Sequence, residues 1–418
     1  MAIGAVLEPL LIVTLLAGGT LVNRDTSRTL SLSSSTRPVS RRPGPWEDLE
    51  YALREDTSLV KDDDNEEKEW STSLSSSELS EDDPKATLPS PWRRRTLRFW
   101  CWERSVMTPN TKLHQDRLLS RLLRQYPFLV EVWYWALIYW VYQLGRAFTA
   151  VTLQTSTVDT AREHALQVIH LEQHLGIFVE APFQQWFLAH PVLMRWTNKV
   201  YSFIHIPGTI LFLIVLFYTT TTRPKRKLRE QDACLNHRTA RLADFGPDVY
   251  SKRRNTMAMC NLLAFIVFTF WPCMPPRLLS DPEYEGPDAA EAKSYGFVDT
   301  VHGADGDSSV WTTNKFCNQY AAMPSLHFGY SFLIGLTVAS VPLRRSGWMG
   351  WKRVAIACAG MVYPAVILTA IVATANHFVL DAVAGAVVCI LAWNLNGGLQ
   401  NLLPLEDYFL NALRIHKP

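Results

Sequence analysis

The sequence predicts an all-α protein of the membrane: a polytopic helical bundle with a six-span core, a disordered N-terminal region and one extra apolar segment at the N-terminus. Three observations support this prediction. Of the 418 residues, 48% are hydrophobic and only 19% are charged. After Pro127, long apolar runs alternate with charged connectors, which is typical of membrane proteins. The connectors themselves alternate in their content of basic residues, as membrane topology requires.

The N-terminal region divides into two parts. Residues 2–22 are apolar but contain Glu8 and Pro9 and have no basic residue before them, so residues 1–23 could be a signal-anchor, a poor signal peptide or a mis-called start. Residues 24–127 are predicted to be a disordered, basic cytosolic region. Up to Pro91 it is rich in Ser and Thr, includes the acidic run KDDDNEEKE and has little apolar surface to bury.

Residues 128–398 hold the predicted six-span domain, and residues 399–418 form a cytosolic tail. Each span is an apolar run close to the length that a helix needs to cross a bilayer, and the fourth and sixth are near the lower limit of about 17 residues. The predicted spans are Phe128–Leu153, Asn198–Thr219, Asn255–Pro275, Ser325–Val341, Val354–Ala375 and His377–Leu395.

The distribution of charge predicts the orientation of these spans. Residues 93–124 contain nine Lys or Arg and two acids, and residues 223–254 contain ten and four. In contrast, residues 154–197 contain two basic residues and four acids, and residues 276–324 contain three and eight. The positive-inside rule therefore places the first pair in the cytosol and the second pair in the lumen or outside the cell. An ER or Golgi membrane with a lumenal active face is our expectation.

Two motifs on the lumenal face carry most of the chemical information. In NHFVLD, the i, i+4 spacing places His377 and Asp381 on one helical face. A carboxylate on one imidazole nitrogen fixes the tautomer and makes the other nitrogen a better nucleophile, as a phosphohistidine mechanism requires. Taken alone the signal is weak, because a polar pair that merely caps a helix would look the same.

In MPSLH, Pro324 suits the first turn of a helix, with His327 immediately inside it. Backbone N–H groups at a helix N-terminus favour phosphate, and Ser325 adds a hydroxyl donor. His327 is then placed to act as a general acid. A simple helix start with an interfacial histidine explains the motif equally well.

Several other polar residues are candidates for substrate binding. Arg277, at the lumenal end of the third span, could clamp phosphate, although a snorkelling arginine would also lie there. Arg146 lies deep in the first span, where a charge needs a partner, so it is a second clamp candidate. Further polar residues on the same face could line a pocket or simply cap and pack helices: Asn198, Tyr201, His205 and Asn376.

Metal and nucleic-acid chemistry find little support. In residues 159–188, apolar residues recur at helical spacing with charges between them, which predicts an interfacial amphipathic helix. The apolar positions are Ala165, Val168, Ile169, Leu171 and Leu175. Its histidines, His164, His170 and His174, are better explained as the polar face than as metal ligands. The cysteines and histidines show no zinc-binding spacing. Cys273 and Cys317 both lie at or near the oxidising face and could form a disulfide. The basic clusters flank membrane spans, so membrane topology explains them without nucleic acid. We expect no metal, no cofactor and no nucleic acid.

AAMPSLHFG, ANHFVLDAVAG and PPRLL…GFVDT resemble the type 2 phosphatidic acid phosphatase superfamily. The resemblance runs from about Leu129 to Asn396 and is strongest to its inositolphosphotransferase branch, which includes fungal inositol phosphorylceramide synthase. It implies a six-span core without metal. It also implies His377 as nucleophile, Asp381 as its orienting acid and His327 as the general acid.

The sequence departs from the phosphatase pattern at three places. Leu326 replaces a Gly, Ala370-Ile371 replaces a Ser-Arg pair, and the first phosphatase motif is not recognisable. One phosphate-binding Arg is therefore missing, which favours a transferase acting on a lipid phosphate or phosphoinositide. A phosphatase, a non-catalytic lipid-binding protein and a two-histidine, one-carboxylate iron site are the alternatives.

Overall fold

The computed structural model describes residues 2–26, 90–99, 102–152, 155–224, 247–286, 288–301, 320–341 and 350–417. The chain forms two compact units. The larger unit comprises Met1–Thr26 and Gln125–Asn401, and the smaller comprises Ser27–Arg124 and Leu402–Pro418. Each unit therefore combines segments that lie far apart in the sequence.

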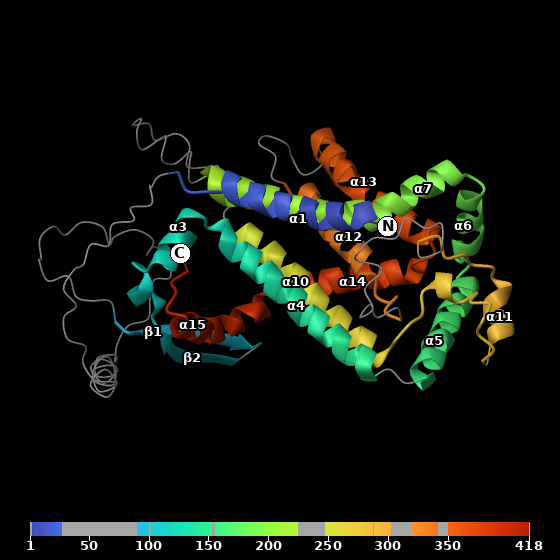
Figure 1. Cartoon of the computed structure of the whole chain (residues 1–418), viewed down its shortest axis with the longest axis horizontal. Coiled ribbons are helices and arrows are strands. Elements are labelled where there is room, and N and C mark those ends of the chain that lie inside the picture. The colour runs from blue at the N-terminus through green and yellow to red at the C-terminus, as the bar shows by residue number, and fades with distance from the viewer. Residues whose placement is uncertain are drawn as a thin grey trace, which may run out of the picture. The chain divides into compact units, whose positions relative to one another are not determined.

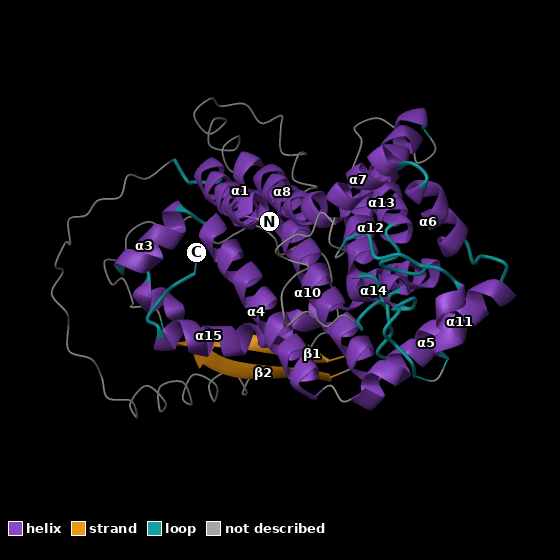
Figure 2. Ribbon diagram, turned by 45° about the vertical axis from the view of Figure 1, so that its right-hand side comes forward, coloured by secondary structure: helices purple, strands orange, loops and turns teal. Residues whose placement is uncertain are grey.

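The larger unit is helical (Figures 1 and 2). Two π-helical turns interrupt its second long helix, at Val200–Ile204 and Tyr218–Thr222, and a 3-10 turn at Pro276–Leu278 follows α10. Its helices are α1 (Ala2–Val22), α4 (Phe128–Thr152), α5 (Thr155–His174), α6 (Glu180–Leu188), α7 (Pro191–Lys199), α8 (His205–Phe217), α10 (Pro247–Phe270), α11 (Ala289–Ser294), α12 (Leu326–Ala339), α13 (Trp351–Ala373) and α14 (Val379–Leu395).

All six predicted spans coincide with helices, and among the described residues three helical stretches are long and apolar enough to cross a membrane: Pro191–Thr222, Trp351–Ala373 and Val379–Ala412. The chain is thus a membrane protein. The fourth predicted span is shorter than expected, because α12 has 14 residues, fewer than the roughly 17 that a straight crossing helix needs. The second is longer, because α7, the π-helical turns and α8 run on without a break. Three spans are confirmed in length and composition, and the six-span core stays a prediction.

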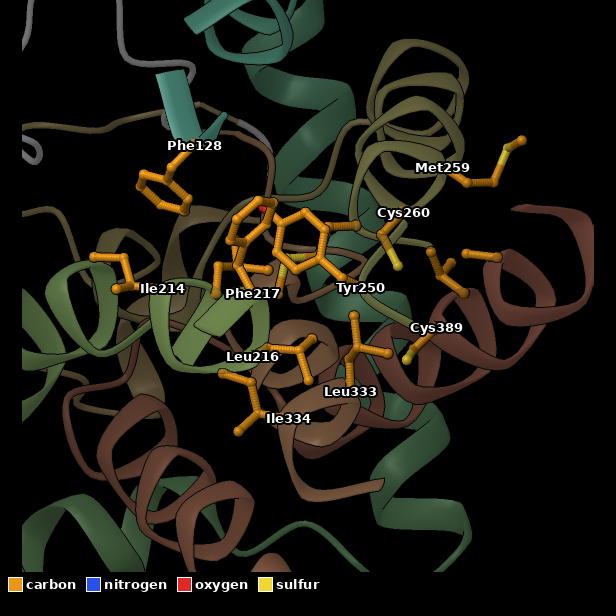
Figure 3. Close-up of a cluster of buried hydrophobic side chains, with 14 residues drawn as sticks. Phe128, Ile214, Leu216, Phe217, Tyr250, Met259, Cys260, Leu333, Ile334 and Cys389 are labelled. Atoms are coloured by element: carbon orange, nitrogen blue, oxygen red, sulfur yellow. The ribbon is translucent and has the colours of Figure 1, made fainter. Parts of the chain in front are cut away.

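The main core lies among α4, α8, α10, α12 and α14 (Figure 3). Phe128 packs edge-on against Phe217, with ring centroids 5.2 Å apart, and Phe217 packs in the same way against Tyr250 at 5.0 Å. Leu333 of α12 and Cys389 of α14 are fully buried in the same cluster. Packing of this kind holds α12 and α14, which carry the two histidine motifs, at a fixed spacing.

Glycines allow α12 to lie close to both of its neighbours. A Cβ atom added to Gly385 of α14 would overlap the carbonyl oxygen of Ser325, immediately before α12. One added to Gly360 of α13 would lie 2.7 Å from the carbonyl oxygen of Gly335 in α12. Small residues at such crossings are the usual way for membrane helices to approach closely.

The N-terminal apolar segment is a helix, α1, that packs within the larger unit. A Cβ atom on Gly19 would meet Ile214 of α8 and Phe128 of α4 at 2.9 and 3.0 Å. Beyond the helix end, Asn23 Oδ1 accepts a hydrogen bond from the Thr222 hydroxyl at 2.6 Å. The assignment of residues 1–23 as a signal-anchor remains a prediction.

The smaller unit contains the β-sheet that the all-α prediction omits. Strands β1 (Trp92–Phe99) and β2 (Trp102–Pro109) pair antiparallel, and among the described residues α3 (Leu118–Gln125), a 3-10 turn (Thr111–His114) and α15 (Leu403–Ala412) accompany them. Asp407 of α15 accepts two hydrogen bonds from the Arg95 guanidinium, at 2.7 and 2.9 Å, and one from the Thr108 hydroxyl at 2.8 Å.

Residues 92–125, the basic part of the region that we placed in the cytosol, form the two strands and α3, and the predicted tail forms α15 against β2. A bidentate ion pair explains why segments from opposite ends of the chain hold together. Residues 27–89, which carry most of the predicted disorder, lie outside the described residues.

Candidate functional site

His377 lies in a tight turn between α13 and α14. The backbone N–H groups of Asn376 and His377 both donate to the Ile371 carbonyl, at 3.0 and 3.3 Å. Ala375 in this turn has a φ of +50°, a left-handed conformation that non-glycine residues adopt only when their surroundings enforce it. The backbone N–H of Arg277, in the segment after α10, donates to the Ala375 carbonyl at 2.8 Å and so stabilises the turn.

The imidazole of His377 is buried, and its Nδ1 atom contacts two oxygen atoms of the protein. Nδ1 lies 2.8 Å from the Ala322 carbonyl oxygen and 3.4 Å from Asp381 Oδ2. A carbonyl only accepts hydrogen bonds, so Nδ1 carries a proton, and in the neutral imidazole the lone pair therefore lies on Nε2. The predicted pairing with Asp381 is present, but the closer partner is a backbone carbonyl that sequence analysis did not identify.

Asp381 connects the two histidine motifs. It is fully buried in the first turn of α14, where Oδ2 accepts the Phe378 N–H at 2.9 Å. Its own carbonyl accepts the Ser325 N–H, also at 2.9 Å. Ser325 is buried as well and caps α12, because its Oγ accepts the Phe328 N–H at 3.3 Å. Pro324 thus lies before the N-cap residue rather than in the first helical turn. The Ser325 hydroxyl oxygen accepts a hydrogen bond from the helix backbone.

Three aromatic rings lie close to the ring of His327. Its ring centroid is 5.7 Å from that of His377, 5.0 Å from that of His205 and 4.8 Å from that of Tyr201. His205 Nδ1 lies 3.1 Å from the Tyr363 hydroxyl of α13. The structure therefore brings the two predicted catalytic histidines together and places Tyr201 and His205, both proposed as pocket residues, beside them.

The second long helix presents Tyr201 and His205 through an irregular turn. The π-helical turn Val200–Ile204 separates α7 from α8. Such turns widen a helix and are frequent at functional sites. Asn198, one turn earlier, bonds Thr300 through both side-chain atoms at 3.1 Å, so it anchors the loop after α11.

Arg277 is held by two side chains beside the His377 turn. Its Nε donates to Asn376 Oδ1 at 3.0 Å, and its Nη1 donates to Asp299 Oδ2 at 2.6 Å. Asn376 is buried and also donates to the Thr374 hydroxyl at 2.8 Å. Asn376, which we predicted as a substrate ligand, thus contacts Arg277 in the structure, and its role as a ligand stays a prediction. Sequence reasoning missed Asp299, although it stands in the GFVDT stretch.

Two further positions bear on the prediction of a phosphate-binding arginine. Ile371, at the position where phosphatases have arginine, is fully buried and packs with Tyr201 and Phe328 in an apolar cluster. Arg146, the second clamp candidate, belongs to α4, but its side chain lies outside the described part of the structure.

The described residues contain no group of three or more His, Cys, Asp or Glu side chains arranged for a metal ion. His164 Nδ1 instead lies 2.7 Å from the Pro272 carbonyl, and His170 Nε2 lies 2.6 Å from Glu291. Cys273 is buried, and its suggested partner Cys317 lies outside the described residues.

These features define a helical membrane protein with two adjacent histidines, one of them held by a carbonyl and a buried carboxylate. A family model described as PAP2 superfamily matches residues 166–234 and 242–395, just over half of the chain. The protein belongs to the PAP2 superfamily. No curated protein and no solved structure gives a significant match to the chain.

Members of this superfamily are typically phosphatases or phosphotransferases. Membership therefore supports a membrane enzyme of the lipid phosphatase or phosphotransferase type. The matched region contains α7, α8, α10, α12, α13 and α14, and with them His205, His327, His377 and Asp381.

Proposed function

We propose that this protein is a lipid phosphotransferase that moves a phosphoryl-containing headgroup, such as inositol phosphate, to a lipid hydroxyl such as that of ceramide. The observation that carries the proposal is the pair of histidines. His377 has one nitrogen fixed by Ala322 and Asp381, and His327 lies 5.7 Å away, centroid to centroid. A phosphorus atom between two such rings has a nucleophile and an acid within reach.

In the first step, Nε2 of His377 attacks phosphorus and forms a P–N bond. The P–O bond to the donor lipid breaks, and His327 gives its proton to the departing oxygen, which leaves as a diacylglycerol hydroxyl when the donor is phosphatidylinositol. His377 now carries a positive charge, which Asp381 Oδ2 stabilises.

In the second step, the acceptor hydroxyl attacks the same phosphorus and gives its proton to His327. The P–N bond breaks, and His377 and His327 return to their starting states. Both steps use only side chains of this chain, so the proposed chemistry requires no metal.

Arg277 is proposed as the phosphate clamp. Its contacts with Asn376 and Asp299 fix the guanidinium plane through Nε and Nη1. A guanidinium has five N–H donors, so other donors remain for phosphate oxygens. This role would compensate for the arginine that Ile371 replaces.

The proposal includes the six-span topology and a lumenal active face in the ER or Golgi membrane. Positive connectors on one side and acidic connectors on the other support it. Arg277, His327 and His377 all come from connectors or helix ends on the acidic side.

Product analysis tests the proposal. The purified protein is reconstituted with labelled phosphatidylinositol and ceramide, and separately with labelled phosphatidic acid alone. Labelled inositol phosphorylceramide supports the transferase. Free phosphate from phosphatidic acid as the sole labelled product identifies a phosphatase, and inositol phosphate as the sole labelled product identifies water, rather than ceramide, as the acceptor. The variant His377→Ala is compared with His174→Ala, a control at an exposed histidine. If His377→Ala turns over substrate as fast as this control, the histidine mechanism is refuted.

A further inference from the structure

The three backbone N–H groups that follow His377 each donate to a different acidic side chain. Phe378 N–H donates to Asp381 at 2.9 Å, Val379 N–H to Glu180 at 2.7 Å, and Leu380 N–H to Glu172 at 2.8 Å. The first N–H groups of a helix have no partner within the helix and need an acceptor from elsewhere. Here α5 and α6 supply two of the acceptors.

Glu172 and Glu180 are both fully buried. The buried residues of α5 recur at helical spacing, Ala161, Ala165, Val168, Ile169 and then Glu172, so Glu172 occupies a core position. Leu171 and Leu175, which we predicted on the apolar face, are 49% and 54% exposed. An acid in the buried stripe of an amphipathic helix has to serve a specific partner, because burying an unpaired charge is costly.

The two carboxyl groups accept hydrogen bonds from neighbouring N–H groups of α14, and a hydrogen bond between them is one of the causes that raise the pKa of Glu172. Glu172 Oε2 is buried, and no N–H or O–H group of the described residues donates to it. Glu180 Oε2 already accepts the Val179 N–H at 2.9 Å. A proton on Glu172 would satisfy both carboxyl groups, since it can be shared with Glu180.

The charges around Glu172 agree with such a proton. The titratable groups that face it are Glu180 of α6, Asp381 of α14 and the Cys273 thiol after α10, and none of them is a cation. Burial, followed by the hydrogen bond with Glu180 and its negative charge, raises the pKa of Glu172 to about 9. At neutral pH the pair therefore holds one proton and one negative charge.

We propose that Glu172 and Glu180 are positioning residues of the phosphoryl-transfer site. They share one proton and hold the first turn of α14, so that His377 Nδ1 keeps its contacts with the Ala322 carbonyl and the Asp381 carboxylate. This inference rests on the proposed function, because it assigns a role around the same nucleophile. A displacement of about 1 Å at a reacting group can cost about 100-fold in rate, so a released turn would lower kcat. The positive end of the α14 dipole stabilises the single charge.

The test compares kcat, KM and their pH profiles for reconstituted wild type, Glu172→Gln, Glu172→Ala and the exposed α5 control Glu163→Gln. Glutamine mimics the protonated carboxyl: its oxygen can accept the Leu380 N–H, and its amide can donate to Glu180. We expect Glu172→Gln to keep the wild-type kcat at neutral pH. We expect the wild type to lose activity as the pH rises through about 9, and Glu172→Gln should lack this alkaline decline. Glu172→Ala should lower kcat about 100-fold with little change in KM.

A second readout does not depend on turnover. Infrared difference spectra between about pH 7 and pH 10 should show a protonated buried carboxyl that titrates in wild type and in Glu163→Gln, and is absent in Glu172→Gln. If His377→Ala keeps both this band and full activity, the proposed mechanism through His377 is refuted. The proton shared by Glu172 and Glu180 is still supported in that case.

Three outcomes overturn the inference itself. The first is wild-type kcat in Glu172→Ala. The second is loss of activity in Glu172→Gln equal to that in Glu172→Ala. The third is a titrating carboxyl band that is unchanged in Glu172→Gln, which needs no active enzyme and stays decisive if the alanine variant fails to fold.

Discussion

Ser325 and Asp381 are joined by a backbone hydrogen bond of 2.9 Å, from the N–H that precedes α12 to a carbonyl in the first turn of α14. This bond connects the MPSLH and NHFVLD motifs directly. It explains why His327 and His377, 50 positions apart in the sequence, have ring centroids only 5.7 Å apart. A backbone contact therefore adds to the packing of the core in setting the relative position of the two histidines.

The close approach of α14 to Ser325 depends on Gly385. We expect Gly385→Ala to displace α14 from α12, since the added methyl group would overlap the Ser325 carbonyl. Overpacking of this kind costs about 1–3 kcal/mol, and the shift should lower kcat at least about tenfold. Activity and thermal stability in detergent would be measured beside Gly397→Ala, whose added methyl group meets nothing within 4 Å. Equal activity of the two variants would contradict the prediction.

Arg277 should not be replaceable by lysine. An ammonium group cannot hold Asn376 and Asp299 in the fixed directions that the guanidinium uses, and it binds phosphate as a point charge. We expect Arg277→Lys to lower kcat/KM by about 100-fold, as measured with the labelled lipid. Arg195→Lys, at an exposed position of α7, is the control. A lysine variant with near wild-type kcat/KM would show that Arg277 is only a boundary residue.

Ile371→Arg should not create a phosphatase. The side chain is fully buried among Tyr201 and Phe328, so an arginine there would place a charge in an apolar cluster at a cost of several kcal/mol. We expect a lower melting temperature and no gain in release of phosphate from phosphatidic acid, with Ile371→Leu as control. Stable protein with a new phosphatase activity would mean that this position reaches the substrate.

The stability of the larger unit should depend on pH through Glu172. The folded carboxyl keeps its proton up to a pKa of about 9, and the unfolded chain loses it near 4.5. Between these values the folded state binds more protons, so this group's contribution to stability falls as pH rises toward 9. Glu172→Gln should flatten the dependence of the melting temperature on pH in this window. An unchanged slope in the variant would refute this assignment.

Apolar runs and charge asymmetry were enough to predict helices at the right places, because bilayer-length apolar segments have few alternatives. The hairpin β1–β2 was missed, since its arginines were explained by membrane topology alone. Its stability comes partly from Asp407, about 300 residues further along the chain, a contact that no local pattern reveals.

Within the site, the i, i+4 spacing correctly predicted that His377 and Asp381 meet. It could not predict Ala322, whose carbonyl is the nearer partner, because every residue offers a carbonyl. Glu172 did leave a signal, an acid at an apolar position of an amphipathic helix. Only the fold, however, shows that it faces the N-terminus of α14.

Trapping of a phosphorylated enzyme tests the central claim most directly. Purified protein is mixed with phosphatidylinositol labelled at phosphorus, without acceptor, and quenched in alkali, which preserves a P–N bond. We predict an acid-labile, alkali-stable label on the peptide that contains His377, absent in His377→Ala and discharged by ceramide. Turnover with no label on His377, or a label that persists in His377→Ala, would contradict the account.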